Sequence, residues 1–369
     1  MRNKPSVVEI MMENASCNMK CKYCFGEFIE NHNCHTNEIP EFNEDILNNC
    51  FKDVDSDYSG TVKLWGGEPL LHFETLEKMA KYVNIKFPKA LKIVLTNGIL
   101  LDENKANTLI KYDIHVTISH DGCGQSSRGL DPLKNKHTIN AIKLLEEHGL
   151  FGGFHIVIHR DSDNLKKQFE YWEGVYDKLG FPIKISGSPI NITDEWTEEF
   201  KLNNDNYNEW IKYELDMITG RSNENEKVKL SLGQEVEYSL FYYVLNHKNR
   251  YLCASLDSKS FGLSGKQYRC VLDCERRSGT DNDKLFVEED FKLMDECKSC
   301  DILPACNGQC LIITDEQRRK NCDHFKSAMR FTKNYIDSTD GLRADLFDVI
   351  SKSGKFQIYD LDELNIEEV

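Results

Sequence analysis

The sequence lacks any run of 18 or more apolar residues, and its opening segment, MRNKPSVVEIMM, has neither the apolar core nor the cleavage site of a secretory signal peptide. Basic residues are also few: 46 lysines and arginines stand against 61 acidic residues, so the net charge is −15. Proteins that bind duplex nucleic acid need a basic surface to neutralise phosphates, and this composition argues against that class. We therefore expect a cytoplasmic protein that does not bind membranes.

Cysteine is abundant, with 14 residues in a chain of 369. In a reducing compartment cysteines serve as metal ligands or catalytic thiols rather than as a disulfide framework. They gather in two places, at residues 17–50 and at residues 253–322, and Cys123 stands apart from both groups. This distribution indicates two modules, each with its own inorganic chemistry.

The first 190 residues alternate between short β-branched runs and helical patterns, which predicts parallel strands joined by helices. Six strands are expected, at residues 7–12, 61–67, 91–98, 114–122, 154–160 and 183–188. Six β/α units are too few for a complete eight-fold barrel, so we expect an α/β fold, a partial (β/α)6 barrel of the TIM type. Active sites of such folds lie at the carboxyl ends of the strands, where polar motifs follow four of these strands.

The motif after the first expected strand is Cys17-x₃-Cys21-x₂-Cys24. Three thiolates in eight residues can hold three corners of a 4Fe–4S cluster and leave the fourth iron open. A structural zinc site is the alternative, with a fourth ligand from Cys34, His32 or His35. Inert buried cysteines are a third interpretation, but three of them in one loop are hard to explain by packing.

This spacing, with the aromatic Tyr23 before the third cysteine, resembles the radical S-adenosylmethionine (radical SAM) superfamily. Gly66-Gly67-Glu68-Pro69, after the second strand, is similar to the family motif that binds the amino group of SAM. The resemblance also implies that further residues contact SAM: Asn97, Ser119, Asp121 and Arg128. It implies that the open iron chelates SAM, and that reductive cleavage of SAM yields a 5′-deoxyadenosyl radical that abstracts hydrogen from a substrate. For the neighbouring His120 we expect structural hydrogen bonding.

The later cysteines resemble the SPASM domain, an extension of radical SAM enzymes that holds two auxiliary 4Fe–4S clusters. The resemblance implies an outer cluster on Cys297, Cys300, Cys306 and Cys322. It assigns the inner cluster to Cys253, Cys270 and Cys310, and Cys274 is a candidate for its fourth ligand. The alternatives are an open iron on the inner cluster and a zinc knuckle on Cys297, Cys300, Cys306 and Cys310. With the SAM cluster, the resemblance implies three 4Fe–4S clusters.

We expect the barrel at residues 1–220, a connecting helical region at 221–250, the small cysteine-rich SPASM domain at 251–325, and a terminal helix with an acidic tail at 326–369. SPASM enzymes mostly modify peptides or proteins, and the chain is similar to anaerobic sulfatase maturases. In those enzymes an aspartate directly after the second SPASM cysteine is the base. Here Val271 fills that place, so Asp273 is the candidate base and that specific activity is in doubt.

The leading hypothesis is therefore a radical SAM/SPASM enzyme that modifies a peptide or protein side chain, with a reductant such as flavodoxin or ferredoxin. The same chemistry on a small molecule, sugar or nucleobase is the alternative. A non-catalytic zinc-binding module is the third hypothesis, against which the cysteine triad and the Gly-Gly-Glu-Pro motif both argue.

Overall fold

The computed structural model describes residues 5, 7–13, 16–24, 39–190, 195–223, 225–232, 243–245, 258–268, 294–306 and 315–353. The chain divides into two compact units, and each is discontinuous in sequence. Unit 1 comprises residues 1–156 and 254–291, and unit 2 comprises residues 157–253 and 292–369. These two units do not coincide with the four consecutive segments expected from the sequence, which are divided at residues 220, 250 and 325. The division into functional domains stays a prediction.

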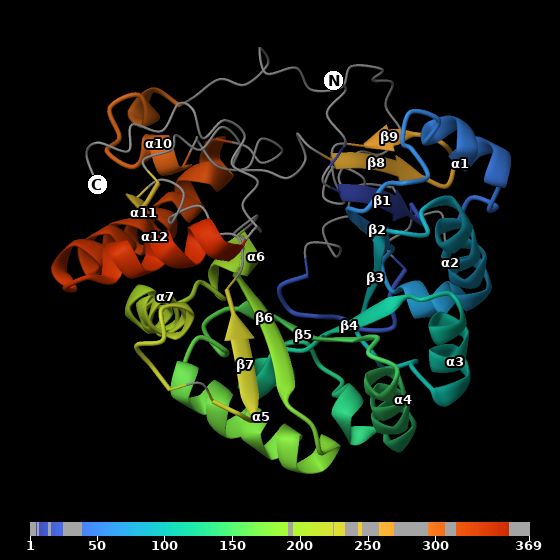
Figure 1. Cartoon of the computed structure of the whole chain (residues 1–369), viewed down its shortest axis with the longest axis horizontal. Coiled ribbons are helices and arrows are strands. Elements are labelled where there is room, and N and C mark those ends of the chain that lie inside the picture. The colour runs from blue at the N-terminus through green and yellow to red at the C-terminus, as the bar shows by residue number, and fades with distance from the viewer. Residues whose placement is uncertain are drawn as a thin grey trace. The chain divides into compact units, whose positions relative to one another are not determined.

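Unit 1 is built on a sheet with the strand order β5-β4-β3-β2-β1-β8-β9 (Figure 1). Every neighbouring pair is parallel except β8 and β9, which form an antiparallel hairpin. The strands are β1 (Val7–Met11), β2 (Thr61–Trp65), β3 (Leu91–Thr96), β4 (His115–Ser119), β5 (Phe151–Ile158), β8 (Ser258–Gly262) and β9 (Gln267–Tyr268). The helices are α1 (Glu44–Cys50), α2 (Phe73–Lys86), α3 (Glu103–Lys111) and α4 (Lys136–Glu147), with short 3₁₀ turns η2 (Pro69–His72), η3 (Gly122–Ser127) and η4 (Pro132–Lys134). The five strands expected in this unit are thus confirmed.

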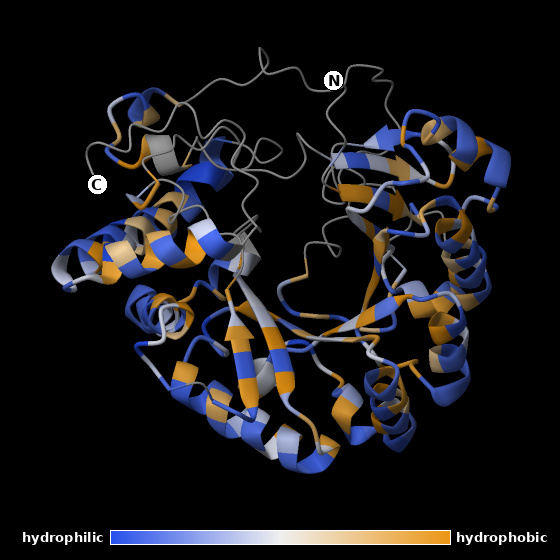
Figure 2. Cartoon of the chain, viewed as in Figure 1, coloured by the Kyte–Doolittle hydropathy of each residue, from blue (hydrophilic) through white to orange (hydrophobic). Residues whose placement is uncertain are grey.

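Local sequence explains where these helices begin and which side they bury. The side chains of Asn43, Asp102 and Asn135 accept hydrogen bonds from the first turns of α1, α3 and α4. Hydrophobic residues lie on one side of α2, α3 and α4 and hydrophilic residues on the other (Figure 2). Burial of the hydrophobic side, including Leu76 and Leu109, is the main source of their stability.

Two glutamates of the first strand segment attach the β8–β9 hairpin to β1. Glu9 is 7% exposed and accepts hydrogen bonds from Trp65 Nε1 at 3.0 Å and from Ser260 Oγ at 2.6 Å. Glu13, in the left-handed region at φ 56°, accepts from the Ser264 backbone at 2.6 Å and from the Tyr268 hydroxyl at 2.6 Å. These contacts fix the hairpin against a strand that lies about 250 residues earlier in the chain.

Unit 2 contains β6 (Ile183–Pro189), the sixth expected strand, paired in parallel with β7 (Val228–Ser231). Its helices are α5 (Leu165–Leu179), α6 (Glu195–Glu198), α7 (Asn204–Ile218), α10 (Leu303–Cys306), α11 (Asp315–Ser338) and α12 (Leu342–Ser353), with a 3₁₀ turn η7 (Asp295–Cys297). Trp172 and Trp210 are fully buried between these elements.

Two features of this unit differ from the local structure expected around the predicted domain boundaries. The region 221–250, expected to be a helical connection, contains β7, because the alternating Val-Lys-Leu-Ser segment satisfies its backbone by pairing with β6. The expected boundary at residue 325 falls inside α11, whose buried stripe, including Phe325 and Met329, runs across it without a break.

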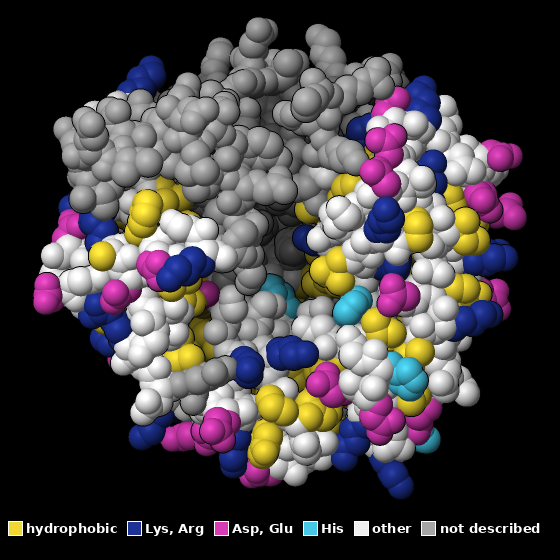
Figure 3. Space-filling model, viewed as in Figure 1, with side chains coloured by type: hydrophobic (Ala, Val, Ile, Leu, Met, Phe, Trp, Pro, Cys, Tyr) yellow, Lys and Arg dark blue, Asp and Glu magenta, His cyan; other side chains and the backbone are white. Residues whose placement is uncertain are grey.

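The surface carries both signs of charge. In Figure 3 lysines and arginines are interspersed with acidic residues over the described part of that face. Among the described helices, none combines the length and the apolar character needed to cross a lipid bilayer.

Candidate active site

The Cys17–Cys24 loop follows β1 directly, as the sequence predicts. Cys17 is exposed, Cys21 is buried, and Cys24 lies between these extremes. The Cys17 sulfur accepts hydrogen bonds from the Met19 backbone at 3.4 Å and from Asn97 Nδ2 at 3.6 Å. N–H groups directed at a cysteine sulfur are typical of sulfurs that ligate iron, because they stabilise the negative charge of the thiolate.

Burial works against the charged form of these cysteines in the metal-free chain. It raises the pKa of Cys21 to about 12 and also raises that of Cys17. Metal coordination reverses that preference, because a metal ion next to the sulfur deprotonates a thiol outright. Within the described residues no three His, Cys, Asp or Glu side chains are arranged around a single metal ion.

A buried polar network anchors this loop to the carboxyl end of β4. The Lys22 backbone donates a hydrogen bond to Ser127 O at 2.9 Å. The Tyr23 hydroxyl donates to Asp121 Oδ2, and Arg128 Nη1 lies 3.1 Å from the Tyr23 oxygen and 3.7 Å from Asp121 Oδ1. Burial and the Asp121 charge raise the pKa of Tyr23, so the phenol stays protonated. The network therefore fixes the loop just before its third cysteine.

Arg128 is only partly used by these contacts. Burial alone lowers its pKa, but the interactions with the Tyr23 oxygen and the Asp121 carboxylate outweigh that effect and raise it far above the usual value, so the guanidinium is charged. Its Nε atom is buried and has no hydrogen-bond partner in the described structure. A buried guanidinium N–H without an acceptor fits a site for an anionic ligand such as a carboxylate.

The Gly66-Gly67-Glu68-Pro69 segment lies against the same loop. The Glu68 backbone N–H donates to Ser16 O at 2.8 Å. A Cβ on Gly66 would come within 3.2 Å of Met12 Sδ, so glycine allows the close approach of this segment to the end of β1.

The Glu68 carboxylate is 2% exposed and joins the ends of β2 and β3. It accepts from Thr96 Oγ1 at 2.5 Å, from the Asn97 backbone at 2.7 Å and from the Leu70 backbone at 3.0 Å. Burial raises its pKa, and these hydrogen bonds partly offset that increase. Oε1 thus accepts from two donors and Oε2 accepts from one donor, so the carboxylate has little remaining capacity to accept hydrogen bonds from a ligand.

His120 is structural, as expected. It is fully buried, its Nε2 lies 3.2 Å from Asp131 Oδ1, and its Nδ1 accepts from the Gly122 backbone at 3.0 Å. The neighbouring Asp121 is equally buried, and its position shows it acting through Tyr23 and Arg128. Direct contacts of Asp121 and Ser119 with SAM stay predictions.

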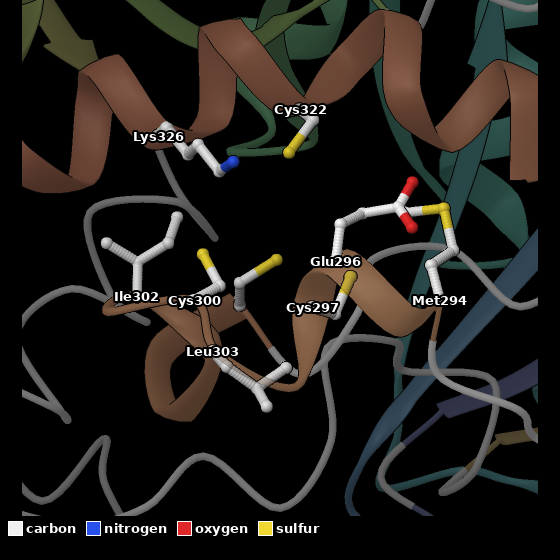
Figure 4. A pocket seen from close by; sticks show the side chains of 9 residues that line it. Met294, Glu296, Cys297, Cys300, Ile302, Leu303, Cys322 and Lys326 are labelled. Atoms are coloured by element: carbon white, nitrogen blue, oxygen red, sulfur yellow. The ribbon is translucent and has the colours of Figure 1, made fainter.

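A second cysteine site lies in unit 2 (Figure 4). Four cysteines line a space of about 350 Å³: Cys297, Cys300, Cys306 and Cys322. They come from η7, the turn after it, α10 and α11. Burial, followed by the charges of Cys322 and Cys300, raises the pKa of Cys297. The set that the structure brings together is the set that the sequence assigns to the outer cluster.

Sequence reasoning missed Lys326, which lines this space one helical turn after Cys322. The charges of Cys322 and Cys300 raise the pKa of Lys326. The signal was available, since residues four apart on a helix share a face. The structure also adds Asn18, which accepts a hydrogen bond from Asn97 Nδ2 at 2.8 Å.

The remaining predicted residues lie outside the described part of the chain: Cys253, Cys270, Cys274, Cys310 and the candidate base Asp273. Nearby, Gly265 in the β8–β9 turn has φ +85°, and a Cβ there would approach Ile46 Cγ2 to 2.8 Å. Both facts require glycine at this position.

Comparisons with known proteins agree with an iron–sulfur site in the first part of the chain. A family model described as a 4Fe-4S single cluster domain matches residues 8–136. The radical SAM cyclopropyl synthase TigE of Paramaledivibacter caminithermalis is 25% identical over 344 residues, which cover 82% of this chain and 67% of the relative. The cysteine-type anaerobic sulfatase-maturating enzyme of Clostridium perfringens is 23% identical over 342 residues, which cover 83% of this chain and 89% of the relative.

The chain is similar to radical SAM maturases over most of its length. Solved structures share its fold. Native anSMEcpe with bound AdoMet and Kp18Cys peptide superposes with a TM-score of 0.59 at 18% identity and covers 90% of this chain and 99% of that one. Streptococcus suis SuiB bound to S-adenosylmethionine gives 0.59 at 17% identity and covers 84% and 73%. The expected α/β fold with a partial barrel is thereby confirmed.

Proposed function

We propose that this enzyme uses SAM to abstract a hydrogen atom from a side chain of a peptide or protein and so forms a crosslink, a thioether, an epimer or an oxidised residue. The observation that carries the proposal is the Cys17–Cys24 loop, fixed by the Tyr23–Asp121–Arg128 network beside an unpartnered Arg128 N–H. That arrangement places three thiols next to a buried cationic donor. Three thiols can hold an iron–sulfur cluster, and a buried cation beside them can bind the carboxylate of a cofactor such as SAM.

Each residue has a defined task in this proposal. Cys17, Cys21 and Cys24 hold the SAM-binding cluster, and Arg128 receives the SAM carboxylate at its buried face. Gly66 and Gly67 let the backbone approach the SAM amino group, while Glu68 holds the ends of β2 and β3 in place. When bound, the cluster and SAM supply the one-electron chemistry that generates a hydrogen-abstracting organic radical.

Two auxiliary clusters complete the proposed enzyme. Cys297, Cys300, Cys306 and Cys322 hold the outer cluster, and the space that they line supports this assignment. The inner cluster takes Cys253, Cys270 and Cys310, with Cys274 as the candidate fourth ligand. Asp273 is the candidate base. A small electron-transfer protein such as flavodoxin or ferredoxin is the proposed reductant.

The peptide substrate is supported by the relatives. One is a sulfatase-maturating enzyme, another is a cyclopropyl synthase, and a similar fold has been solved with peptides bound. The departure at Val271, where sulfatase maturases have their base, argues for a different modification in this enzyme.

Iron content tests the cofactor assignment. The chain is purified without oxygen and reconstituted, and iron and sulfide are counted for the wild type, for Cys17/Cys21/Cys24→Ala and for Cys297/Cys300→Ala. We expect about 12 iron atoms for the wild type and about 8 for each variant, since each set of cysteines holds one four-iron cluster. Cys50→Ala and Cys123→Ala are controls that keep all 12. A wild type with about four irons, or with zinc in their place, contradicts the assignment.

Substrate class is tested by isotope transfer. Short peptides encoded beside the gene are deuterated at the Cα and Cβ positions of their Cys, Ser and aromatic residues and incubated with enzyme, SAM and dithionite. Peptide hydrogen abstraction predicts deuterium in the 5′-deoxyadenosine that is released. Release of unlabelled 5′-deoxyadenosine with every peptide, together with labelling from a small molecule, contradicts the peptide assignment and supports the alternative substrate class.

A further inference from the structure

The space between the four outer cysteines has one cationic residue in its lining, Lys326. Cys322 and Lys326 lie four residues apart on α11, so the two side chains leave the same face of that helix. Figure 4 shows the Lys326 ammonium directed toward the Cys322 sulfur, with Cys300 across the space. The ammonium therefore faces two of the four proposed ligands.

Other basic side chains near these cysteines are neutralised by carboxylates. Arg318 pairs with Asp315, Arg319 with Glu296, and Arg330 with Asp301 at 2.8 Å. In the described part of unit 2, no carboxylate forms an ion pair with Lys326. Glu296 and Asp301 feel the Lys326 charge, but each forms its own ion pair with an arginine, Arg319 and Arg330 respectively.

Proximity makes that charge effective. Besides the four cysteines and Lys326, the lining consists of the apolar Met294, Ile302 and Leu303 and the acidic Glu296. Lys326 is only half-buried, so its ammonium acts on the sulfurs through its closeness to Cys322 rather than through a dry surrounding. The reduction potential of an iron–sulfur cluster depends on nearby charge and on hydrogen bonds to its sulfurs, and a cation favours the reduced state because reduction adds negative charge.

We propose that Lys326 raises the reduction potential of the outer auxiliary cluster by holding its ammonium against the Cys300 and Cys322 sulfurs. This inference rests on the proposed assignment of the outer cluster. Lys326 does not ligate the cluster. It acts through the positive charge that it places next to two of the ligating sulfurs. By keeping the outer cluster easier to reduce, it makes that cluster an acceptor for electrons that leave the substrate or arrive from the reductant.

The test is a redox titration followed by electron paramagnetic resonance. It is performed in the Cys17/Cys21/Cys24→Ala background, so that the remaining signals come from auxiliary clusters. Lys326→Gln removes the charge, Lys326→Arg keeps it, and Lys333→Gln removes a lysine charge from the same helix. Lys333 pairs with Asp337 at 2.6 Å and does not line the space.

We expect Lys326→Gln to make one midpoint potential more negative by about 59 mV or more, which is a tenfold change in a one-electron equilibrium. Lys326→Arg and Lys333→Gln leave the potentials unchanged. An unchanged midpoint in Lys326→Gln, with its iron content intact, overturns the inference alone. If Cys297/Cys300→Ala keeps all its iron, the cluster assignment fails, and the inference fails with it.

Discussion

The two cysteine sites differ in what surrounds their sulfur atoms. Around Cys17–Cys24 the partners are polar groups at the ends of β2, β3 and β4, including Asn97, Asp121 and Arg128. Around Cys297–Cys322 the lining is apolar apart from Glu296 and Lys326. The first environment provides hydrogen-bonding groups for a polar ligand. The second surrounds its four cysteines mainly with apolar side chains and offers few such groups.

The number of cysteines agrees with that contrast. Three cysteines leave one corner of a four-iron cluster for another molecule, and Arg128 offers an unpartnered N–H in the same unit. In the proposed outer cluster, four cysteines from η7, its following turn, α10 and α11 would leave no corner free. On this account the same metal cluster is reactive in one place and a carrier of electrons in the other because the protein supplies a different fourth partner.

The largest expected effect is on the rate of SAM cleavage, which should depend strongly on the first cysteine site and only weakly on the second. Cys17/Cys21/Cys24→Ala should lower the rate of SAM cleavage by more than about 1,000-fold, since the cofactor performs the difficult chemistry. Cys297/Cys300→Ala should stay within about tenfold of wild type when dithionite supplies the electrons, because the SAM cluster is intact. Release of 5′-deoxyadenosine measures both rates. Equal loss in the two variants would show that the sites do not have separate roles.

Arg128→Ala should weaken SAM binding by about 100-fold, because the loss of a buried cationic partner of a carboxylate costs about 2–5 kcal/mol. Equilibrium binding of SAM to the reconstituted enzyme measures the effect. Arg160→Ala is the control, since Arg160 is exposed, forms an ion pair with the adjacent Asp161 and lies over the ring of Phe200, away from the three early cysteines in sequence and in unit. Unchanged SAM affinity in Arg128→Ala would show that the SAM carboxylate does not bind at Arg128.

Glu68→Gln should destabilise the folded enzyme by about 2 kcal/mol, because an amide group would present N–H donors to the donors of Thr96 or Asn97. Chemical denaturation of the holoenzyme measures the change. Glu74→Gln, at an exposed position in the first turn of α2, should change stability by less than about 0.5 kcal/mol. Equal stability of the two variants would mean that Glu68 does not hold the strand ends together.

A smaller effect concerns pH and His155, a residue of β5 that interacts electrostatically with Asp121 and Arg128. Burial lowers the pKa of His155 to about 4, below its unfolded value of about 6.5. The neutral form is favoured in the folded state, so this stability is complete above pH 6.5 and is lost as pH falls toward the folded pKa. Between pH 7 and 5.5 the loss should be about 1 kcal/mol. His155→Gln should remove that part of the slope, whereas His148→Gln, at an exposed site, should retain it.

Most of the first unit is predictable from sequence because its signals are local. Apolar runs such as Leu91–Thr96 end at turn-forming residues, and glycines such as Gly149, just after α4, adopt the left-handed conformation where a helix ends. The Cys17–Cys24 loop is recognised by spacing alone. These features need no knowledge of which segments meet in space.

The parts that sequence reasoning did not find depend on long-range pairing. The segment of β8, Ser258–Gly262, has no strong alternation, and it becomes a strand by pairing with β1 and by contacts with Glu9 and Glu13. The partners of Glu68 are set by the pairing of β2 and β3. The resemblance to the SPASM domain implies that Cys306 and Cys322 act together, but only the packing of α10 and α11 shows Lys326 beside them.

The contrast between an open and a closed cluster is tested most directly by electron paramagnetic resonance of the reduced enzyme with and without SAM. The account predicts that SAM changes the spectrum of one cluster, that Cys17/Cys21/Cys24→Ala abolishes the change, and that Cys297/Cys300→Ala preserves it. A spectrum that does not respond to SAM, or a response that survives loss of the three early cysteines, would contradict it.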